Sequence, residues 1–143
     1  MPLPVPEPGL VISYSYLWHS EYERDQEEGL KDRPCAIILV AEDDAGETVV
    51  TVVPVTHSPP EGEAVEIPLT IKRRLRLDEA RSWVVVSEVN RFVWPGPDLR
   101  PMPRGEPERF DYGFLPPSLF RQIRDRLLAA AAAQKLNVVP RSE

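Results

Sequence analysis

Alternation of apolar and polar positions first appears in segment 10–16, where apolar residues alternate with Ser13 and Ser15. This period of two predicts a β-strand with one face toward solvent. Two later segments, 35–41 and 48–55, are rich in apolar and β-branched residues and are separated by the turn sequence "EDDAGE". We expect these two segments to pair as an antiparallel hairpin.

Weaker patterns predict a short strand at 64–67, a helical turn at 71–75 and a fifth strand at 82–89, continued by "NRFVW" past a bend. The last element is predicted to be a helix that begins after Pro117 and ends at Asn137. Its apolar stripe recurs at helical spacing and comprises Leu119, Phe120, Ile123, Leu127 and Ala131. We therefore predict a mainly β (α+β) fold, a small barrel of about five strands with a C-terminal helix.

The chain has 143 residues, which is enough for one domain with one core. We predict a single domain over 1–143, with its core over about 9–137. The net charge of −6 by itself argues against a nucleic-acid partner. The charge is uneven, however: segment 21–28 holds five acids, 71–76 holds four basic residues, and 121–126 holds three arginines.

Several classes of chemistry are excluded at this level. One cysteine and two histidines give no metal-ligand spacing, and no glycine-rich phosphate loop or nucleophile elbow is present. We therefore predict no metal and no cofactor. The N-terminal segment has no signal-peptide pattern, and no apolar run approaches the roughly 20 residues of a membrane span. These features predict a cytoplasmic protein without a membrane partner.

A pair of polar side chains is expected at the open end of the hairpin, where the first strand begins and the second strand ends. Arg33 precedes Pro34, which favours extended geometry and directs the arginine to the mouth of its strand. Thr56 follows the second strand, so antiparallel pairing brings it to the same end of the sheet as Arg33. A guanidinium beside a hydroxyl suits a phosphate or a carboxylate. The alternative is that Arg33 pairs with Asp32 or with a loop glutamate.

The segments "PGLVISYSY", "HSE", "RPCAIILV", "VVPVTHS" and "SWVVVSEVNRFVW", followed by the terminal helix, resemble the MazF/PemK (Kid) toxins. The resemblance implies an SH3-like (CcdB-like) barrel and a ribosome-independent endoribonuclease that acts as a homodimer. By position, Arg33 matches the catalytic arginine of that family and Thr56 its catalytic threonine. Glu21 matches an acid that some members need. His19 lies near an active-site histidine of one branch, while Ser87-Glu88 departs from the usual acid–glutamine pair.

Metal-free RNA cleavage needs a base for the 2′-OH, a cation for the phosphate and an acid for the leaving oxygen. The resemblance assigns Arg33 to charge stabilisation and Thr56 to holding the phosphate. Glu21 is the first candidate base, His19 the second, and His57 a possible acid. Glu88 is a further possible site residue. The basic segment supplies the RNA-binding candidates Lys72, Arg73, Arg74 and Arg76.

The expected partners are single-stranded RNA, an acidic antitoxin protein and a second copy of the chain. The homodimer is expected because the fifth strand and segment 92–94 carry more apolar surface than a small barrel needs. The acidic segment 21–28 either forms a solvated loop or places one carboxylate beside Arg33. Two rival functions remain: a non-catalytic binding module of the same fold, and a gyrase poison resembling CcdB, which has no need of the Arg33–Thr56 pair.

Overall fold

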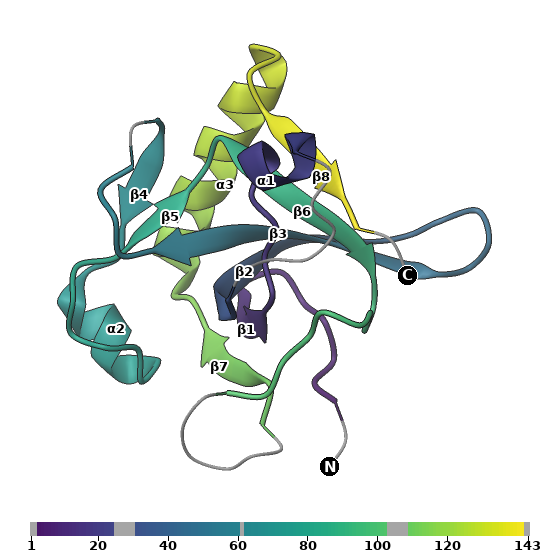
Figure 1. Ribbon diagram of the computed structural model, residues 1–143. Helices are drawn as coiled ribbons and strands as arrows, with labels where there is room; N and C mark the ends of the chain where they lie inside the picture. Colours follow the sequence, from purple (N-terminus) through teal and green to yellow (C-terminus); the bar gives the residue numbers. More distant parts are fainter. Residues whose placement is uncertain (1–2, 25–30, 61, 103–108, 142–143) are drawn as a thin grey trace.

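The computed structural model describes residues 3–24, 31–60, 62–102 and 109–141 (Figure 1). Within these ranges the chain forms eight strands and three helices. The strands are β1 (Leu10–Tyr14), β2 (Arg33–Glu42), β3 (Thr48–Thr56), β4 (Ala64–Glu66), β5 (Trp83–Val85), β6 (Glu88–Val93), β7 (Asp111–Phe114) and β8 (Asn137–Pro140). The helices are α1 (His19–Glu23), α2 (Leu69–Arg74) and α3 (Pro117–Ala132).

The strands form one sheet in the order β4-β5-β3-β2-β1-β7, with β6 paired to β3 and to β8. All pairs are antiparallel except β6 with β8, which is parallel. The predicted mainly β fold with a C-terminal helix is confirmed. The predicted small barrel is not observed: the sheet does not close, because the path of paired strands ends at β4 and at β7. The predicted strand number was too low, because β7 and β8 have no clear sequence pattern.

The predicted hairpin is confirmed as β2 and β3, the longest pair of strands in the sheet. Cys35 lies opposite Pro54, and the pairing continues to Glu42 opposite Thr48. The turn sequence between the strands therefore joins them directly, as the short separation predicted. This hairpin is the central pair of the sheet, with β1 on one side and β5 and β6 on the other.

The predicted fifth strand is divided into β5 and β6. Both run beside β3, where β5 pairs with Val55 and Thr56, and β6 pairs with 49–52. Between them the backbone N–H of Val86 donates to the carbonyl of Glu63 instead of to β3. The strand therefore bends at 86–87, and this bend opens the sheet beside the end of β3.

The central strands are covered on both faces. One core cluster packs Val11, Ala36 and Val53 against Leu119 and Ile123 of α3. The other cluster lies on the opposite face, and its members include Ile12, Tyr14, Cys35, Val52 and Phe92. Phe92 is buried and stacks on Tyr14, so this aromatic belongs to the core rather than to an exposed dimer face.

Two local predictions were wrong, one on the burial of a strand face and one on the end of a helix. Ser13 and Ser15, predicted to face solvent, are 1% and 3% exposed. Their N–H groups donate to the carbonyls of Phe110 and Asp98, so segments 98–102 and 109–111 cover this side of β1. Helix α3 ends at Ala132 rather than at Asn137, which instead begins β8 beside Glu88.

The apolar stripe of α3 is largely as predicted. Leu119, Ile123 and Leu127 are buried, Phe120 is half-buried, and Ala131 is exposed. Helix α1 forms within the segment that was expected to be a polar loop. In the described part of the chain, no helix is long and apolar enough to cross a membrane.

Candidate functional site

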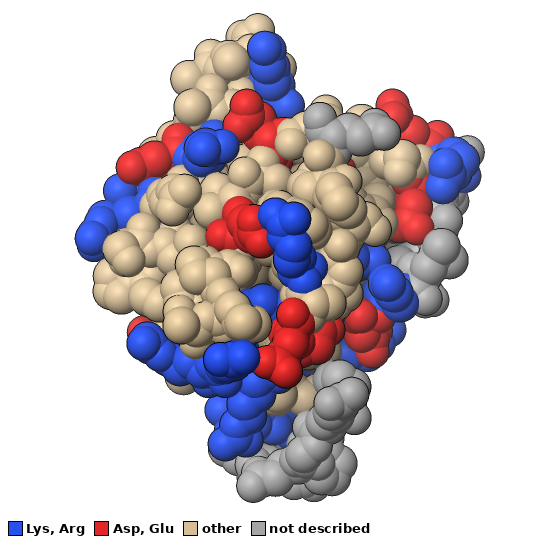
Figure 2. All heavy atoms as spheres, turned by 90° about the vertical axis from the view of Figure 1, so that its left-hand side faces the viewer, with Lys and Arg blue, Asp and Glu red and all other residues tan. Residues whose placement is uncertain are grey.

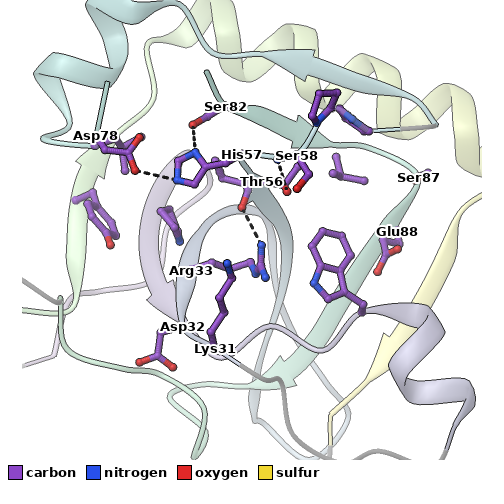
Figure 3. A pocket seen from close by; sticks show the side chains of 18 of the residues that line it. Lys31, Asp32, Arg33, Thr56, His57, Ser58, Asp78, Ser82, Ser87 and Glu88 are labelled. Atoms are coloured by element: carbon purple, nitrogen blue, oxygen red, sulfur yellow. Dashed lines mark hydrogen bonds and ion pairs between the residues drawn. The ribbon is translucent and has the colours of Figure 1, made fainter. Parts of the chain in front are cut away.

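A cavity of about 820 Å³ opens at the end of the hairpin, where β2 begins and β3 ends (Figure 3). Arg33 and Thr56 both line it, because the Cys35–Pro54 register places the start of β2 beside the end of β3. The other walls come from the segment before α1, from the turn after β3, from the α2–β5 connection and from the bend between β5 and β6. This is the convergence that antiparallel pairing predicted.

Arg33 is half-buried and has few partners. Its Cζ lies 4.9 Å from the centre of the Trp18 ring, and its Nη1 donates a long hydrogen bond of 3.5 Å to the carbonyl of Val55. Its Nε is buried and has no hydrogen-bond partner among the described residues. The expected alternative, a pair with Asp32, does not form: the Asp32 carboxylate instead faces Arg100 at 3.7 Å. The guanidinium is therefore fixed in place without a described counter-ion.

Thr56 faces the same cavity. Its Oγ1 accepts the N–H of Ser58 at 3.2 Å, which is the local turn hydrogen bond of a strand-end threonine. A hydroxyl can donate one hydrogen bond while it accepts another. The turn therefore orients the Thr56 hydroxyl and leaves its hydrogen available for an anion in the cavity.

Glu21 and His19, the two candidate bases, do not line the cavity. Glu21 is buried, and its Oε1 accepts the N–H of Trp18 at 3.0 Å, so it caps the start of α1. His19 Nδ1 lies 3.5 Å from the carboxylate of Glu23 on the next turn of the same helix. Both side chains thus serve α1, which the sequence had not predicted, and α1 in turn carries Trp18 at its start.

Glu88 is the described glutamate that does line the cavity. Its Oε1 accepts hydrogen bonds from the Tyr16 hydroxyl at 3.1 Å and from the N–H of His19 at 2.9 Å. Burial raises the pKa of Glu88 above its ordinary value, against the lowering effect of these hydrogen bonds. Burial and the nearby Glu88 charge also raise the pKa of Tyr16. A carboxyl group with a raised pKa is suited to proton transfer.

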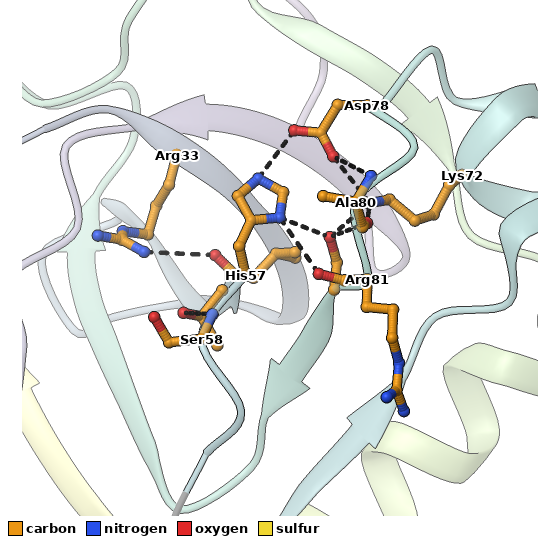
Figure 4. Close-up of polar contacts among 10 residues, drawn as sticks. Arg33, His57, Ser58, Lys72, Asp78, Ala80 and Arg81 are labelled. Carbon is orange, nitrogen blue, oxygen red and sulfur yellow. Dashed lines mark hydrogen bonds and ion pairs between the residues drawn. The ribbon is translucent and has the colours of Figure 1, made fainter.

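On the opposite wall, His57 belongs to a polar network with Asp78 and Ser82 (Figure 3), which Lys72 joins from behind (Figure 4). His57 Nε2 lies 2.8 Å from Asp78 Oδ2, and its Nδ1 lies 3.0 Å from Ser82 Oγ. Asp78, His57 and Ser82 thus have the connectivity of a nucleophilic triad. Ser82 is only 1% exposed, however, and its Oγ accepts a hydrogen bond from the Lys72 ammonium, which does not suit a nucleophile.

Lys72 joins the members of this network from its buried side. Its side chain is 2% exposed, and its Nζ donates to Asp78 Oδ1 at 3.0 Å, to Ser82 Oγ at 2.5 Å and to the carbonyl of Ala80. Partial burial would raise the pKa of Asp78, but the hydrogen bond from Lys72 and the charges of His57 and Lys72 outweigh it and lower that pKa. Lys72 uses all three of its donors internally, so it is not available to bind RNA as predicted.

The other RNA-binding candidates fall into different positions. Arg73 pairs with Glu79 at 2.9 Å, and Arg74 is exposed at the end of α2. Only Arg76 of the four lines the cavity. Figure 2 shows that Lys and Arg side chains gather in the lower part of the face that carries β4, β5 and α2.

The charges around the cavity are not balanced within the described residues. Lys31, Arg33 and Arg76 line it and form no ion pair with a described carboxylate. Its two aspartates, Asp32 and Asp78, are each paired with a basic side chain, Arg100 and Lys72 respectively. Among the described lining residues, these three unpaired cations therefore outnumber the one carboxyl group without a basic partner, Glu88, although the chain as a whole is acidic. This arrangement suits a ligand with phosphate or carboxylate groups.

Sequence reasoning missed Trp18, Asp78 and Ser82 in the site. Trp18 precedes the short helix α1, which has too few residues for a recognisable period. Asp78 and Ser82 lie in the connection from α2 to β5, whose course depends on Lys72 being buried. Residues 25–30 of the acidic segment lie outside the described ranges, and with them the predicted contact of that segment with Arg33.

No protein-family model matches this chain. A search of curated proteins found no match either.

Proposed function

We propose that this protein is a metal-independent endoribonuclease that cuts single-stranded RNA in the cavity at the end of the β2–β3 hairpin. The observation that carries the proposal is Arg33, a half-buried guanidinium held against Trp18 without a described counter-ion. Holding a charge in this way costs free energy unless a ligand uses it. A phosphate group is the ligand that a guanidinium and the adjacent Thr56 hydroxyl fit.

Four of the residues that line the cavity have a role in this reaction. Arg33 stabilises the charge that develops on the phosphate oxygens, and Thr56 donates a hydrogen bond to one of them. Glu88 takes the role first expected of Glu21, because Glu88 lines the cavity and its pKa is raised. It accepts the proton of the 2′-OH, whose oxygen attacks the phosphorus to form a cyclic phosphate. The 5′ oxygen leaves and takes up a proton.

His57 is the candidate donor of that proton. It lies on the wall that also carries Asp78 and Ser82, and both of its ring nitrogens have partners in this structure. To protonate the leaving oxygen it must release one of them. Of the two contacts, the one with Asp78 lies nearer to solvent, since both of those side chains are 52% exposed.

We further propose the biological setting that the resemblance to MazF/PemK toxins implies. The chain would act in the cytoplasm as a homodimeric toxin with a variant of the SH3-like fold, and an acidic antitoxin would neutralise the basic cavity. The shared features are the central hairpin that opens with "RP" and ends with "PVT", and the C-terminal helix packed on the sheet. Sedimentation at micromolar concentration tests the dimer, and a single monomeric species would contradict it.

Cleavage of an end-labelled RNA in EDTA tests the enzymatic function. We expect products that end in 2′,3′-cyclic phosphate, and no cleavage where the 2′-OH is replaced by hydrogen. Arg33→Ala should reduce the rate on the order of 10²–10³-fold, as loss of one preorganised donor does elsewhere. Arg121→Ala removes an exposed arginine of α3 and is the matched control. Equal rates for the two variants would contradict the proposal.

A non-catalytic binding module is the second candidate. It is favoured by the turn hydrogen bond of Thr56 and by the engagement of both His57 nitrogens, which leave few groups ready for proton transfer. The same experiment separates the two functions when RNA binding is measured beside cleavage. Binding that depends on Arg33 without any cleavage identifies a binding module.

A further inference from the structure

Arg76 occupies a backbone position that normally favours glycine. Helix α2 has its C-cap at Leu75, and Arg76 follows with a φ of 60°, in the left-handed region. The N–H of Leu77 donates to the carbonyl of Lys72 at 2.9 Å, and the N–H of Arg76 donates to that of Arg73 at 3.2 Å. These two hydrogen bonds define a Schellman motif, in which glycine is the usual residue at the position of Arg76.

The motif itself is firmly anchored, so Arg76 is held in this conformation. Leu75 is 2% exposed in the core cluster beneath α3, and Leu77 packs against the same cluster. The Arg76 side chain takes no part in the two hydrogen bonds of the motif or in the packing of Leu75 and Leu77. An arginine at this place strains the backbone more than glycine would and adds nothing to the motif.

The side chain of Arg76 lines the same cavity as Arg33. It is exposed, and it pairs with no described carboxylate, whereas the neighbouring Lys72 and Arg73 pair with Asp78 and Glu79. Among the basic residues at the end of α2, Arg76 therefore combines a strained backbone, a place in the cavity and a charge that no described carboxylate neutralises. Backbone strain of this kind gathers at functional sites.

We propose that Arg76 is a binding residue for a second phosphate of the RNA, adjacent to the phosphate that lies at Arg33. The inference rests on the proposed function and adds a requirement to it: the substrate must extend beyond the two nucleotides that flank the cut. A polyanion fits this cavity better than a single anion, because Arg33 and Arg76 each need an acceptor.

The experiment measures binding rather than cleavage, so it does not depend on catalysis. The probe is a short single-stranded 2′-O-methyl oligonucleotide, followed by fluorescence anisotropy between about 50 and 200 mM salt. Arg76→Gly should weaken binding and reduce the slope of log K against log salt by about 0.7, the value for one phosphate contact on a single strand. Arg76→Lys should retain most of the slope.

Thermal unfolding of the same variants separates binding from structure. Arg76→Gly should unfold at the same temperature as the wild type or above it, because glycine suits the left-handed position. A variant that loses affinity while keeping or gaining stability has lost a ligand contact.

Arg74→Ala is the control for the salt dependence of binding. Arg74 is exposed and lies outside the cavity lining, so its replacement should change the slope of log K against log salt less than Arg76→Gly does.

A 2′-O-methyl dinucleotide with a single phosphodiester and no terminal phosphate is the decisive comparison. Measured by competition, its affinity should be unchanged by Arg76→Gly and reduced by Arg33→Ala. An equal loss on the dinucleotide and on the longer probe would overturn the second-phosphate assignment, as would an unchanged salt slope. Polyglutamate serves as a second probe. If Arg76→Gly weakened the binding of polyglutamate and left the binding of the oligonucleotide unchanged, the second-phosphate assignment would be overturned in favour of an acidic protein partner.

The outcomes for the two proposals are distinct. If the protein does not cleave RNA but its binding of the probe still depends on Arg76, the proposed ribonuclease function is refuted and the phosphate site at Arg76 is retained. If cleavage depends on Arg33 but binding of the probe does not depend on Arg76, only the assignment of a second phosphate to Arg76 is refuted. Wild-type protein that binds no probe at low salt overturns the inference.

Discussion

His57 and Asp78 contact each other across one wall of the cavity, with His57 Nε2 and Asp78 Oδ2 separated by 2.8 Å. Asp78 also accepts from the buried Lys72 and from the N–H of Ala80. The carboxylate therefore joins the turn after β3 to the connection between α2 and β5. Its contribution to the stability of the protein depends on its being ionised.

Asp78→Asn should lower the free energy of unfolding by about 1–2 kcal/mol at about pH 7, a modest value because the side chain is half exposed. The pKa of Asp78 is lowered in the folded protein, so its contribution is present above the ordinary value of 3.8 and is lost as pH falls through the folded pKa. Urea unfolding from pH 7 down to about pH 3 should show the two proteins converging at low pH. If the two proteins differed in free energy of unfolding by the same amount at every pH, ionised Asp78 would not be the source of this stability.

Lys72→Met should destabilise the protein by about 2–4 kcal/mol, because it leaves buried acceptors without a donor. The affinity of the folded variant for RNA should stay unchanged, since the Lys72 ammonium faces inward. Thermal unfolding and anisotropy on the same preparation check both statements. Arg74→Ala is the surface control, with an expected change in stability within about 0.5 kcal/mol. RNA affinity lost through Lys72→Met without destabilisation would refute the internal role of Lys72.

Glu88→Gln separates stability from catalysis. Glutamine keeps an acceptor for the Tyr16 hydroxyl and for the His19 N–H, and it removes a half-buried charge. Because the pKa of Glu88 is raised in the folded protein, its stabilising effect is full below the unfolded pKa and is lost as pH rises through the folded pKa. The variant should gain stability relative to wild type above that range.

Cleavage by the same Glu88→Gln variant should fall about 10²–10⁴-fold, the range for loss of a general base. Gel-based rates from acidic to alkaline pH measure it, and the wild-type rate should rise with pH as Glu88 ionises. Glu21→Gln, at the α1 cap, is the comparison, and its rate should stay near wild type at temperatures where it is folded. If Glu21→Gln lowered the cleavage rate more than Glu88→Gln did, Glu21 rather than Glu88 would be the general base.

Arg141→Met tests a buried ion pair near the C-terminus. Arg141 Nη2 lies 2.9 Å from Asp98 Oδ2, and Nη1 donates to the carbonyl of Ser15 at 2.7 Å. Both side chains are nearly inaccessible to solvent. Removing one partner of such a pair should cost about 3–5 kcal/mol in the free energy of unfolding. Urea unfolding measures this loss, and the exposed Lys135→Met should change stability by less than about 0.5 kcal/mol.

The cavity was predictable in part because its central pair is set by local pattern. A short turn between two apolar segments allows only antiparallel pairing with a narrow choice of register, so Arg33 before β2 and Thr56 after β3 reach the same end. The buried stripe of α3 followed in the same way from helical spacing at Leu119, Ile123 and Leu127. In each case the signal lies within one segment of the chain.

Tertiary structure alone decided which polar residues face the cavity. Glu88 enters it because Tyr16, 72 residues earlier, donates to its carboxylate, whereas Glu21 is used by the first turn of α1. Lys72, which looks like its basic neighbours in sequence, is buried because Asp78, Ala80 and Ser82 surround its ammonium. The periodicity of a segment determines its own faces, but the burial of a charge depends on partners that other segments bring to it.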